Sequence, residues 1–388
     1  MIVYVTTQGA RIVREGRHLL VTQGDTVYHT LFVSKLEQLV LCGNITLTTP
    51  ALSTLLREEV DTVFLRKDGR YRGRLATGES KNVYLRRRQF QLCDDQDFCR
   101  RCAIAIVRGK LANMITLLQR IKRTRKQLSP EQAIHSIRDL LQNLPDQTRL
   151  DKIRGIEGAA SARYFEGLRA GFDDDHGFYK RVRRPPTDPV NSVLSLLYTL
   201  LINRMYAAVR LAGLDPYPGV LHALDYGRHA LPLDLVEEFR APLADALTLA
   251  LFNLKVLQQK DFYLFDPPSI ELPRPAETPL DQVVQDSLGR MSATDDEADE
   301  NDTLFDLPEQ NISSQADITG RQGKGALRLH SEAFKKVINA FEKKLQTPFF
   351  HPLAERRMSY ADALVFQARY YRRVIEGETE EYRPLLLR

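Results

Sequence analysis

The sequence predicts an α+β protein in which a small N-terminal β-sandwich-like domain precedes a larger all-α domain with a disordered acidic insert. Short apolar runs separated by turn-forming glycines occupy residues 1–80. From about residue 90 onward, apolar residues recur every three to four positions, which is the period of a helix. A third stretch, 291–320, holds nine acidic residues and neither lysine nor arginine. With 388 residues, the chain is long enough for two or three domains.

The β-rich domain is expected to span residues 1–80 and to include one short helix that begins near Thr49-Pro50, since proline is tolerated in the first turn of a helix. Its short apolar runs are separated by turn signals such as Gly9, Gly16 and Gly24, which favours strands. The predicted strands are 4–6, 11–14, 18–21, 26–32, 40–42, 45–47, 63–65 and 71–75.

A linker is expected at 81–90, and the α-helical domain at 91–388. Residues 267–325 are rich in proline and then in acidic residues, so they bury too little apolar surface to offset the entropy of ordering and are predicted to be disordered. The predicted helices are 90–126, 130–142, 150–168, 189–212, 233–258, 331–345 and 360–376.

The formal net charge of +5 conceals an uneven distribution. Without 291–320, 55 basic residues face 41 acidic ones, which is +14 over 358 residues. Such a body suits a polyanionic partner, although a soluble basic surface is the plainer interpretation. Four cysteines in so long a chain favour a reducing compartment over a disulfide framework. We expect no leader and no membrane segment, because the longest apolar stretch, 193–202, is too short to span a bilayer.

Two regions carry residues suited to metal chemistry. Glu157 lies among small residues that let a neighbouring backbone approach, although most helical glutamates are solvated or ion-paired. His222 precedes a segment in which Asp234 and Glu237 share one face of a helix and Glu238 follows. One imidazole with carboxylates suits Mn²⁺ or Mg²⁺, whereas the alternative is a satisfied histidine near acids favoured by a helix N-terminus. Zinc at Cys93, Cys99 and Cys102 is a weaker hypothesis, because no second pair follows.

Several segments combine basic residues at a density that could neutralise phosphates, namely 86–88, 120–126 and 180–184. Tyr179 stands beside the third of these and could stack on a base. The alternative is a solvated basic face. Neither a phosphate-binding P-loop nor a G-x-S-x-G nucleophile motif occurs, so nucleotide-driven and serine-hydrolase chemistries are unsupported.

Taken in order, these motifs resemble the CRISPR-associated adaptation integrases, the larger of the two universal spacer-acquisition proteins. The resemblance extends from Met1 to Arg388 outside the insert. Two departures, Ala230 and Ala241, replace residues common in the family but remove no ligand. The matching segments are Gly109-Lys110-Leu111-Ala112-Asn113, Gly155-Ile156-Glu157-Gly158, Tyr164-Phe165, 184–191, 219–222, Gly227-Arg228, 233–240, Ser359-Tyr360 and Gln367-Ala368-Arg369.

The resemblance implies a divalent-metal-dependent DNA endonuclease and integrase whose helical domain is catalytic. A spacer 3′-OH end would be joined to a repeat by transesterification. Glu157, His222 and Glu237 are implied as the catalytic residues and the ligands of Mg²⁺ or Mn²⁺, with Asp234 as a supporting neighbour. Candidate DNA-binding residues are Arg163, Arg181, Arg183, Arg184, Arg228 and Arg240.

The family likeness also implies partners: double-stranded DNA, a second copy of the chain joined through the β-rich domain, and the smaller adaptation protein, in the cytoplasm of a prokaryote. Two rival hypotheses remain. One is a catalytically silent, basic DNA-binding scaffold, and the other is a related integrase of a mobile element that keeps the same site.

Overall fold

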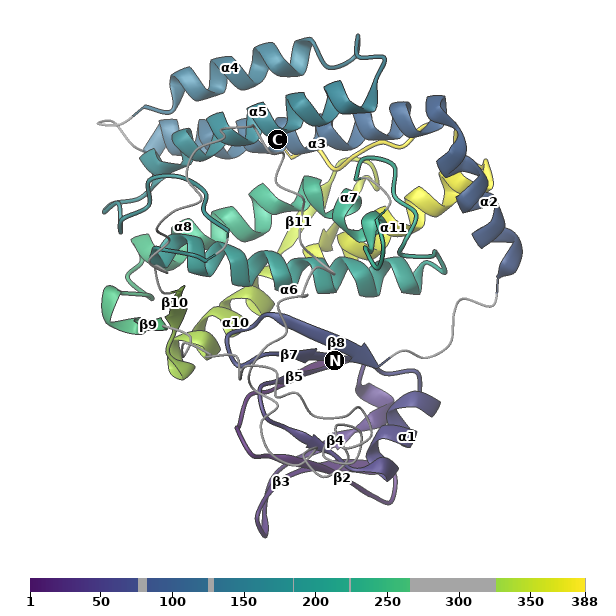
Figure 1. Ribbon diagram of the computed structural model, residues 1–388, viewed down its shortest axis with the longest axis vertical. Helices are drawn as coiled ribbons and strands as arrows, with labels where there is room; N and C mark the ends of the chain where they lie inside the picture. The colour runs from purple at the N-terminus through teal and green to yellow at the C-terminus, as the bar shows by residue number, and fades with distance from the viewer. Residues whose placement is uncertain (76–81, 125–128, 184, 223–224, 266–325, 388) are drawn as a thin grey trace, which may run out of the picture.

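The computed structural model describes residues 1–75, 82–124, 129–183, 185–222, 225–265 and 326–387. A strand-rich part formed by the first 75 residues lies at one end of the molecule, and a larger helical body forms the rest (Figure 1). The α+β prediction is therefore confirmed. The predicted disordered insert, 267–325, lies outside the described residues.

The N-terminal part contains two four-stranded sheets. One has the strand order β4-β3-β2-β6, and the other has the order β1-β5-β7-β8 with β1, β5 and β7 parallel. The elements are β1 (Ile2–Val5), β2 (Arg11–Glu15), β3 (His18–Gln23), β4 (Thr26–Phe32), a 3₁₀ turn (Val33–Lys35), β5 (Gln38–Cys42), β6 (Thr46–Leu47), α1 (Thr49–Arg57), β7 (Asp61–Leu65) and β8 (Tyr71–Leu75).

Strand β5 shows how the two parts share one sheet. Successive side chains of a strand point to opposite faces, so β5 can serve two cores. Leu39 and Leu41 belong to the core between the two sheets, whereas Val40 and Cys42 belong to the core of the helical body. The sheet is therefore covered on both faces, which explains why every residue of β5 is buried.

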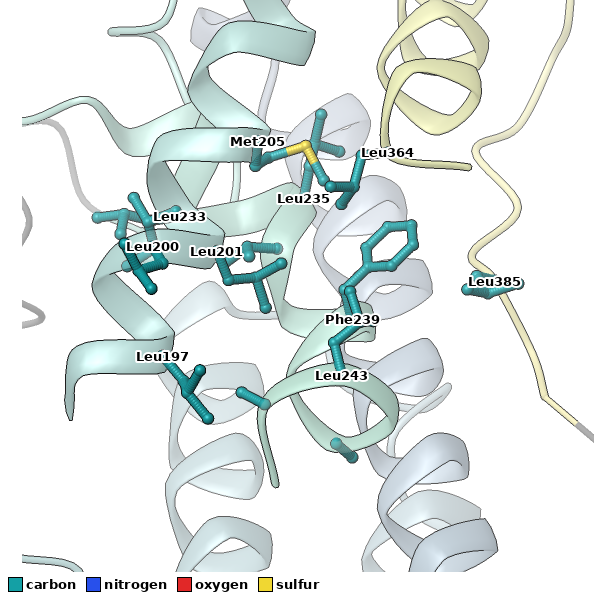
Figure 2. Close-up of a cluster of buried hydrophobic side chains, with 14 of the residues drawn as sticks. Leu197, Leu200, Leu201, Met205, Leu233, Leu235, Phe239, Leu243, Leu364 and Leu385 are labelled. Carbon is teal, nitrogen blue, oxygen red and sulfur yellow. The ribbon is translucent and has the colours of Figure 1, made fainter. Parts of the chain in front are cut away.

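The helical body packs around two central helices, α3 and α6 (Figure 1). In the buried cluster of Figure 2, Leu197, Leu201 and Met205 of α6 face Leu235 and Phe239 of α7. Its helices are α2 (Val83–Asp94), α3 (Gln96–Thr124), α4 (Glu131–Gln142), α5 (Leu150–Leu168), α6 (Pro189–Leu211), α7 (Ala230–Phe239), α8 (Ala246–Asn253), α10 (Ser331–Leu345) and α11 (Tyr360–Glu376), with short turns at Arg169–Gly171 and Gln259–Asp261.

Four details differ from the prediction. The linker expected at 81–90 is helical from Val83, and the helix expected over 90–126 is two helices, because Asp95 caps α3 by accepting hydrogen bonds from the backbone amides of Asp97 and Phe98. A π-helix at Arg240–Asp245 divides the helix expected over 233–258. The helical body is not purely α, because it carries the hairpins β9–β10 (Phe262–Phe265, Ala326–Leu329) and β11–β12 (Pro348–His351, Arg356–Ser359).

By length and composition alone, α3 and α6 could cross a membrane. In the fold, however, 67% and 72% of the residues in their apolar windows are buried inside the protein. Central helices of a large helical core are apolar on most sides, because neighbouring helices surround them. Their hydropathy is therefore accounted for by packing.

Candidate active site

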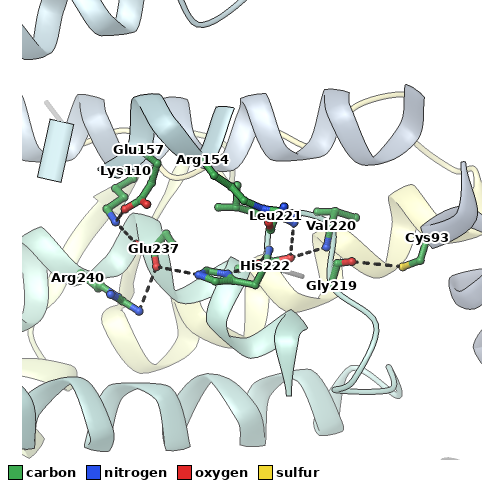
Figure 3. A network of polar contacts seen from close by, with 11 residues as sticks. Cys93, Lys110, Arg154, Glu157, Gly219, Val220, Leu221, His222, Glu237 and Arg240 are labelled. Atoms are coloured by element: carbon green, nitrogen blue, oxygen red, sulfur yellow. Dashed lines mark hydrogen bonds and ion pairs between the residues drawn. The ribbon is translucent and has the colours of Figure 1, made fainter. Parts of the chain in front are cut away.

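Two of the three predicted metal ligands meet across a lysine. Glu157 of α5 and Glu237 of α7 both face Lys110 of α3, a helix that packs against both (Figure 3). Lys110 Nζ donates to Glu157 Oε1 and lies 2.6 Å from Glu237 Oε2. The Lys110 and Glu237 side chains are only 5% and 1% exposed, so this is a buried ionic cluster.

Glu157 reaches this cluster because it lies on the buried face of α5. Ile153, Ala160 and Tyr164 of the same helix are buried, and Glu157 falls on their face at helical spacing. Ser161, one turn later, donates to Glu157 Oε1 over 2.9 Å. A carboxylate on an otherwise apolar helix face needs charge compensation, and Lys110 supplies it.

The third predicted ligand, His222, is held by Asp234. The Asp234 carboxylate is fully buried and accepts hydrogen bonds from the backbone amides of Val220, Leu221 and His222 over 2.6, 3.0 and 2.9 Å. Its Oδ1 also lies 2.6 Å from His222 Nδ1. The other ring nitrogen, His222 Nε2, lies 4.0 Å from Glu237 Oε1, and in a neutral imidazole whose Nδ1 donates to the carboxylate it carries the lone pair.

Gly219 allows this loop to lie against α7. A Cβ atom at Gly219 would come within 2.7 Å of both Ala230 Cβ and Asp234 Oδ2 and within 2.9 Å of a backbone carbon of Ala230. Contacts that short do not occur, so a larger residue would push the loop away from the helix. The glycine thus allows the close approach through which Asp234 orients His222.

Neighbouring groups hold the pKa of both carboxylates in the cluster below its ordinary value. Burial by itself raises the pKa of Glu237, but Arg240 and Lys110 outweigh it and bring the pKa to about 2. Arg240 Nη2 lies 3.1 Å from Glu237 Oε1. Burial also raises the pKa of Glu157, yet Lys110 and Ser161 leave it below its ordinary value. Both carboxylates are therefore ionised at neutral pH.

The donor set suits a hard divalent cation. Two anionic carboxylates and an imidazole whose other nitrogen is fixed by a carboxylate form a mixed oxygen and nitrogen set that suits Mg²⁺ or Mn²⁺. In the part of the chain that the structure describes, no three His, Cys, Asp or Glu side chains converge closely enough to hold a metal as they stand. The ammonium of Lys110 is the positive charge between Glu157 and Glu237 here.

Glu238, the neighbouring acid, points elsewhere. Its carboxylate accepts hydrogen bonds from Gln367 Nε2, the Tyr382 hydroxyl and the backbone amide of Leu385, over 2.8, 3.0 and 2.9 Å. Burial raises the pKa of Glu238 to about 7, despite these donors. The residue anchors the C-terminal segment, so the site has two carboxylates besides Asp234.

The predicted DNA-binding arginines divide into different environments. Arg181 is engaged inside the protein, where its guanidinium donates to Val182 O, Asn191 Oδ1 and Ser195 Oγ. Arg163 is exposed but paired with Glu166 over 3.0 Å. The structure therefore gives neither of them an unoccupied guanidinium.

Arg240 and Arg228 lie near the buried cluster. Arg240 contacts Glu237, and burial lowers the pKa of Arg228, which is close to Asp225 and Asp234. Arg183 is half-buried, and Arg184 lies outside the described residues. Arg228 and Arg240 are thus the predicted arginines that the fold brings to the site.

Two further motif residues have roles that the sequence did not reveal. Lys110 is the buried cation of the cluster, and Asn113 binds the C-terminal segment through Leu385 O and the amide of Leu387. Both belong to the segment 109–113 that carried the family likeness. The motif marked segment 109–113 as important, but the spacing of its residues does not reveal that Lys110 is the side chain that points toward Glu157.

The cysteine hypothesis finds no support among the described residues. All four cysteines are free, and none belongs to a group that could hold a metal. Cys99 Sγ instead donates to the backbone oxygens of Leu92 and Cys93. Cys93 of α2 packs against the core of the helical body as a partly buried side chain, and Cys99 and Cys102 of α3 and Cys42 of β5 are buried in it.

Comparison with known proteins shows the family. The protein-family model described as "CRISPR associated protein Cas1" matches residues 3–267 of this chain. "CRISPR-associated endonuclease Cas1 3" of Thermus thermophilus is 29% identical over 100% of this chain and 97% of its own. "CRISPR-associated endonuclease Cas1 1" of Moorella thermoacetica is 31% identical over 91% of this chain and 88% of its own.

Solved structures share the fold. A CAS1 protein from Thermotoga maritima has a TM-score of 0.73 at 18% identity, with 97% of each chain covered. A casposase bound to an integration product has a TM-score of 0.76 at 17% identity, covering 98% of this chain and 92% of its own. A Cas6-RT-Cas1–Cas2 complex has a TM-score of 0.74 at 22% identity over 99% of this chain, which spans only 36% of that longer one. From the family model and the full-length relatives, this chain belongs to the family of CRISPR associated protein Cas1.

Proposed function

We propose that the protein is a divalent-metal-dependent DNA endonuclease and integrase of CRISPR adaptation, which joins spacer 3′-OH ends to a repeat by transesterification. The observation that carries the proposal is the buried cluster of Glu157, Glu237 and Lys110 with His222 at its edge. Ionised carboxylates are costly to bury, so their retention beside an oriented imidazole favours a catalytic role. Relatives named as Cas1 endonucleases support it.

In this proposal Glu157, Glu237 and His222 hold Mg²⁺ or Mn²⁺. Such an ion, when bound, polarises a phosphoryl oxygen and lowers the pKa of the attacking hydroxyl. Asp234 keeps the proton of His222 on Nδ1, so that Nε2 is available as a ligand. Arg240 beside Glu237 and the nearby Arg228 carry positive charge suited to phosphate oxygens.

The proposed partners are double-stranded DNA and the smaller adaptation protein. The casposase neighbour is bound to an integration product and another neighbour is a complex with Cas2, which supports both at the level of a shared fold. The net charge of +14 outside 291–320 favours a polyanion. We place the protein in the cytoplasm of a prokaryote, where these partners reside.

Strand β4 supports a homodimer through the N-terminal part. It lies at the edge of its sheet, and Val27, Tyr28 and Phe32 are 51%, 49% and 45% exposed. An uncovered edge with exposed apolar side chains is prone to pair with another chain. Replacing Val27 and Tyr28 by Asp should convert a dimer to monomer in analytical ultracentrifugation, and an unchanged dimer would place the interface elsewhere.

The experiment that tests the function is joining of a short labelled duplex into repeat-containing plasmid DNA, with and without chelator. Joining should require Mn²⁺ or Mg²⁺, and His222→Ala and Glu237→Ala should abolish it. Glu166→Ala, an exposed change on α5, should leave joining intact.

The same assay separates the rival hypotheses. A catalytically silent scaffold binds DNA, joins none, and is indifferent to chelator and to these variants. An integrase of a mobile element joins DNA without preference for a CRISPR repeat. The family match favours the CRISPR protein over both.

A further inference from the structure

Helix α2 supports the segment that leads into the candidate active site. Arg86, Gln89 and Cys93 stand at i, i+3 and i+7, so they form one stripe along the helix. Arg86 pairs with Asp215 over 2.8 Å, and Gln89 Nε2 donates to the backbone oxygen of the same residue over 2.8 Å. Cys93 Sγ, at the end of the stripe, lies 3.7 Å from Gly219 O (Figure 3). A thiol therefore makes the contact nearest to the site.

The contact at Gly219 reaches the imidazole through one peptide unit. The carbonyl of Gly219 and the amide of Val220 belong to the same planar unit, so they move together. Asp234 accepts from that amide over 2.6 Å and also holds the amide and the Nδ1 atom of His222. The Cys93 thiol and the Asp234 carboxylate thus hold the two ends of one peptide unit.

A second thiol, Cys99, lies beside Cys93 across the break between α2 and α3. The backbone is extended at Asp95, which ends α2, so the first turn of α3 comes back to the last turn of α2. Cys99 Sγ donates to Cys93 O over 3.2 Å and to Leu92 O over 3.6 Å. The Cys93 thiol hydrogen-bonds to the Cys99 side chain and lowers the pKa of Cys99, although burial and nearby acids oppose this shift.

The pair has the features of an oxidisable dithiol. Cys93 is partly exposed, so a small oxidant reaches its sulfur from solvent, whereas Cys99 is 4% exposed. Redox-sensing cysteines are accessible and stand next to a second thiol that can resolve the first oxidation product. Cys102, one turn further along α3, is 3% exposed and lacks such access. Disulfides in cytosolic proteins are usually transient and redox-sensing, which fits a pair that is reduced here.

We propose that Cys93 and Cys99 form a reversible disulfide when a hydroperoxide oxidises them, and that this bond loosens the support of His222. With hydrogen peroxide, the Cys93 sulfur attacks one oxygen, the O–O bond breaks, and the thiol proton leaves with the other oxygen as water. Cys99 then attacks the Cys93 sulfur, the S–O bond breaks, and the departing hydroxide takes the Cys99 proton as a second water. Two thiols are thereby oxidised to one disulfide and one peroxide is reduced.

The disulfide changes the contact with the active-site segment. It removes the S–H that faces Gly219 O and turns the Cys93 sulfur toward α3. The peptide unit between Gly219 and Val220 then loses its thiol hydrogen bond, and the orientation of His222 by Asp234 is weakened. As regulation of the candidate active site, this inference rests on the proposed function.

The test compares the reduced full chain with the same chain after hydrogen peroxide and again after dithiothreitol. Peptide mass spectrometry should find a cross-link between Cys93 and Cys99 in the oxidised chain. Hydrogen exchange of residues 220–222 should quicken, and Mn²⁺ affinity in calorimetric titration should fall about tenfold, as is typical when the support of a ligand is lost. Dithiothreitol should restore both, because it reduces a disulfide and leaves a sulfinic acid unchanged.

Two variants serve as matched controls, each compared with itself before and after peroxide, so that its own stability does not enter. Cys99→Ser keeps the Cys93 thiol at Gly219 but lacks the second thiol, so it should show no cross-link and keep its exchange rate. Cys102→Ala keeps the pair and should respond to peroxide as the wild type does.

Absence of the cross-link between Cys93 and Cys99, or an oxidised chain with unchanged exchange and unchanged Mn²⁺ affinity, would overturn the proposal. An equal response of Cys99→Ser to peroxide would also overturn it. A wild type that forms the cross-link and exchanges faster at 220–222, yet binds no Mn²⁺ and joins no DNA when reduced, would support the disulfide and contradict the proposed function.

Discussion

At the scale of single residues, Lys110 compensates the charge of the two carboxylates in the candidate active site. Its ammonium lies between two ionised carboxylates from different helices and almost completely out of solvent. Neither carboxylate would remain ionised at neutral pH in that position without compensation. In the proposed function, a divalent cation held by Glu157 and Glu237 would make the same compensation, so Lys110 and the cation would serve the same two groups.

We predict that Lys110→Met destabilises the metal-free protein by about 3 kcal/mol, because removing one partner of a buried ion pair leaves uncompensated charge. Added Mn²⁺ should raise the melting temperature of this variant more than that of the wild type. Thermal unfolding with and without MnCl₂ measures both effects. Lys122→Met, which breaks an exposed pair with Glu131, should leave the free energy of unfolding almost unchanged and show no altered response to Mn²⁺. Equal Mn²⁺ shifts in wild type and Lys110→Met would contradict this role.

Asp234→Asn tests the orientation of His222. The carboxylate serves three backbone amides and one imidazole nitrogen, whereas an amide offers one oxygen and turns an N–H toward donors. We expect Mn²⁺ affinity to fall about 10–100-fold, as is typical when a residue that orients a ligand is lost. Calorimetric titration measures it. Asp225→Asn, an exposed neighbour of the loop, should retain affinity, and unaltered binding by Asp234→Asn would show that His222 needs no such support.

At the scale of elements, the C-terminal segment is hydrogen-bonded to α3 and α7 beside the candidate active site. Asn113 donates to Glu238 O and Leu385 O and accepts from the amide of Leu387. A Cβ atom at Gly109 would lie 2.4 Å from Pro384 Cβ, so the glycine permits this close packing. The segment therefore covers the helix that carries Lys110.

Asn113→Ala should destabilise the protein by about 2 kcal/mol, because the buried groups it serves lose their partners. Hydrogen exchange should also quicken in residues 380–387. Asn143→Ala at the exposed end of α4 is the matched control. Unchanged hydrogen exchange of residues 380–387 in Asn113→Ala would mean that apolar contacts alone hold the C-terminal segment.

The π-helix Arg240–Asp245 carries a buried acid that gives a pH signature. Asp245 accepts from the hydroxyls of Tyr164 and Tyr198 over 2.7 and 2.6 Å, yet burial raises its pKa from 3.8 to about 6. The folded state thus holds a proton that the unfolded state releases between about pH 4 and pH 6. Its contribution to stability is complete below this window and lost as the pH rises through it.

Asp245→Asn should remove the pH dependence of stability that the Asp245 carboxyl group causes. The free energy of unfolding of the variant, relative to wild type, should rise by about 2–3 kcal/mol from pH 4 to pH 7. Urea denaturation across this range measures the difference, with exposed Asp97→Asn as the control. A constant difference at all pH values would mean that Asp245 is ionised throughout.

The periodicity of the sequence predicts the bounds of a helix correctly where the helix has one regular pattern of buried and exposed residues along its length. The helices α5, α10 and α11 begin and end where the periodicity predicts. The sequence did not predict the division between α7, the π-helix and α8, because the apolar pattern continues through Arg240–Asp245. Only the tertiary contacts of Asp245 and Arg240 set this segment apart from the flanking helices. Glu157 was correctly predicted as a residue on a small-residue helix, but its partner Lys110 is 47 residues away and becomes a neighbour only through helix packing.

At the scale of the whole molecule, acidic residues are concentrated in segment 291–320, and the rest of the chain is strongly basic. The charge of +14 outside 291–320 favours a polyanionic partner, whereas the proposed chemistry depends on a few buried groups drawn from α3, α5 and α7. Charge of that kind steers DNA to the protein but does not choose a reaction. The central claim is therefore that one buried cluster, Glu157 with Glu237 and His222, performs the reaction.

The most direct test of that claim is to measure, on the same preparations, DNA binding and joining of a labelled duplex in Mn²⁺ for Glu157→Gln and for Glu166→Gln on the same helix. The change at Glu157 preserves size and removes one charge from the cluster, and Glu166 is exposed. We predict that Glu157→Gln binds DNA with the affinity of the wild type and joins none, whereas Glu166→Gln does both. Joining by Glu157→Gln at the rate of the wild type would contradict the account.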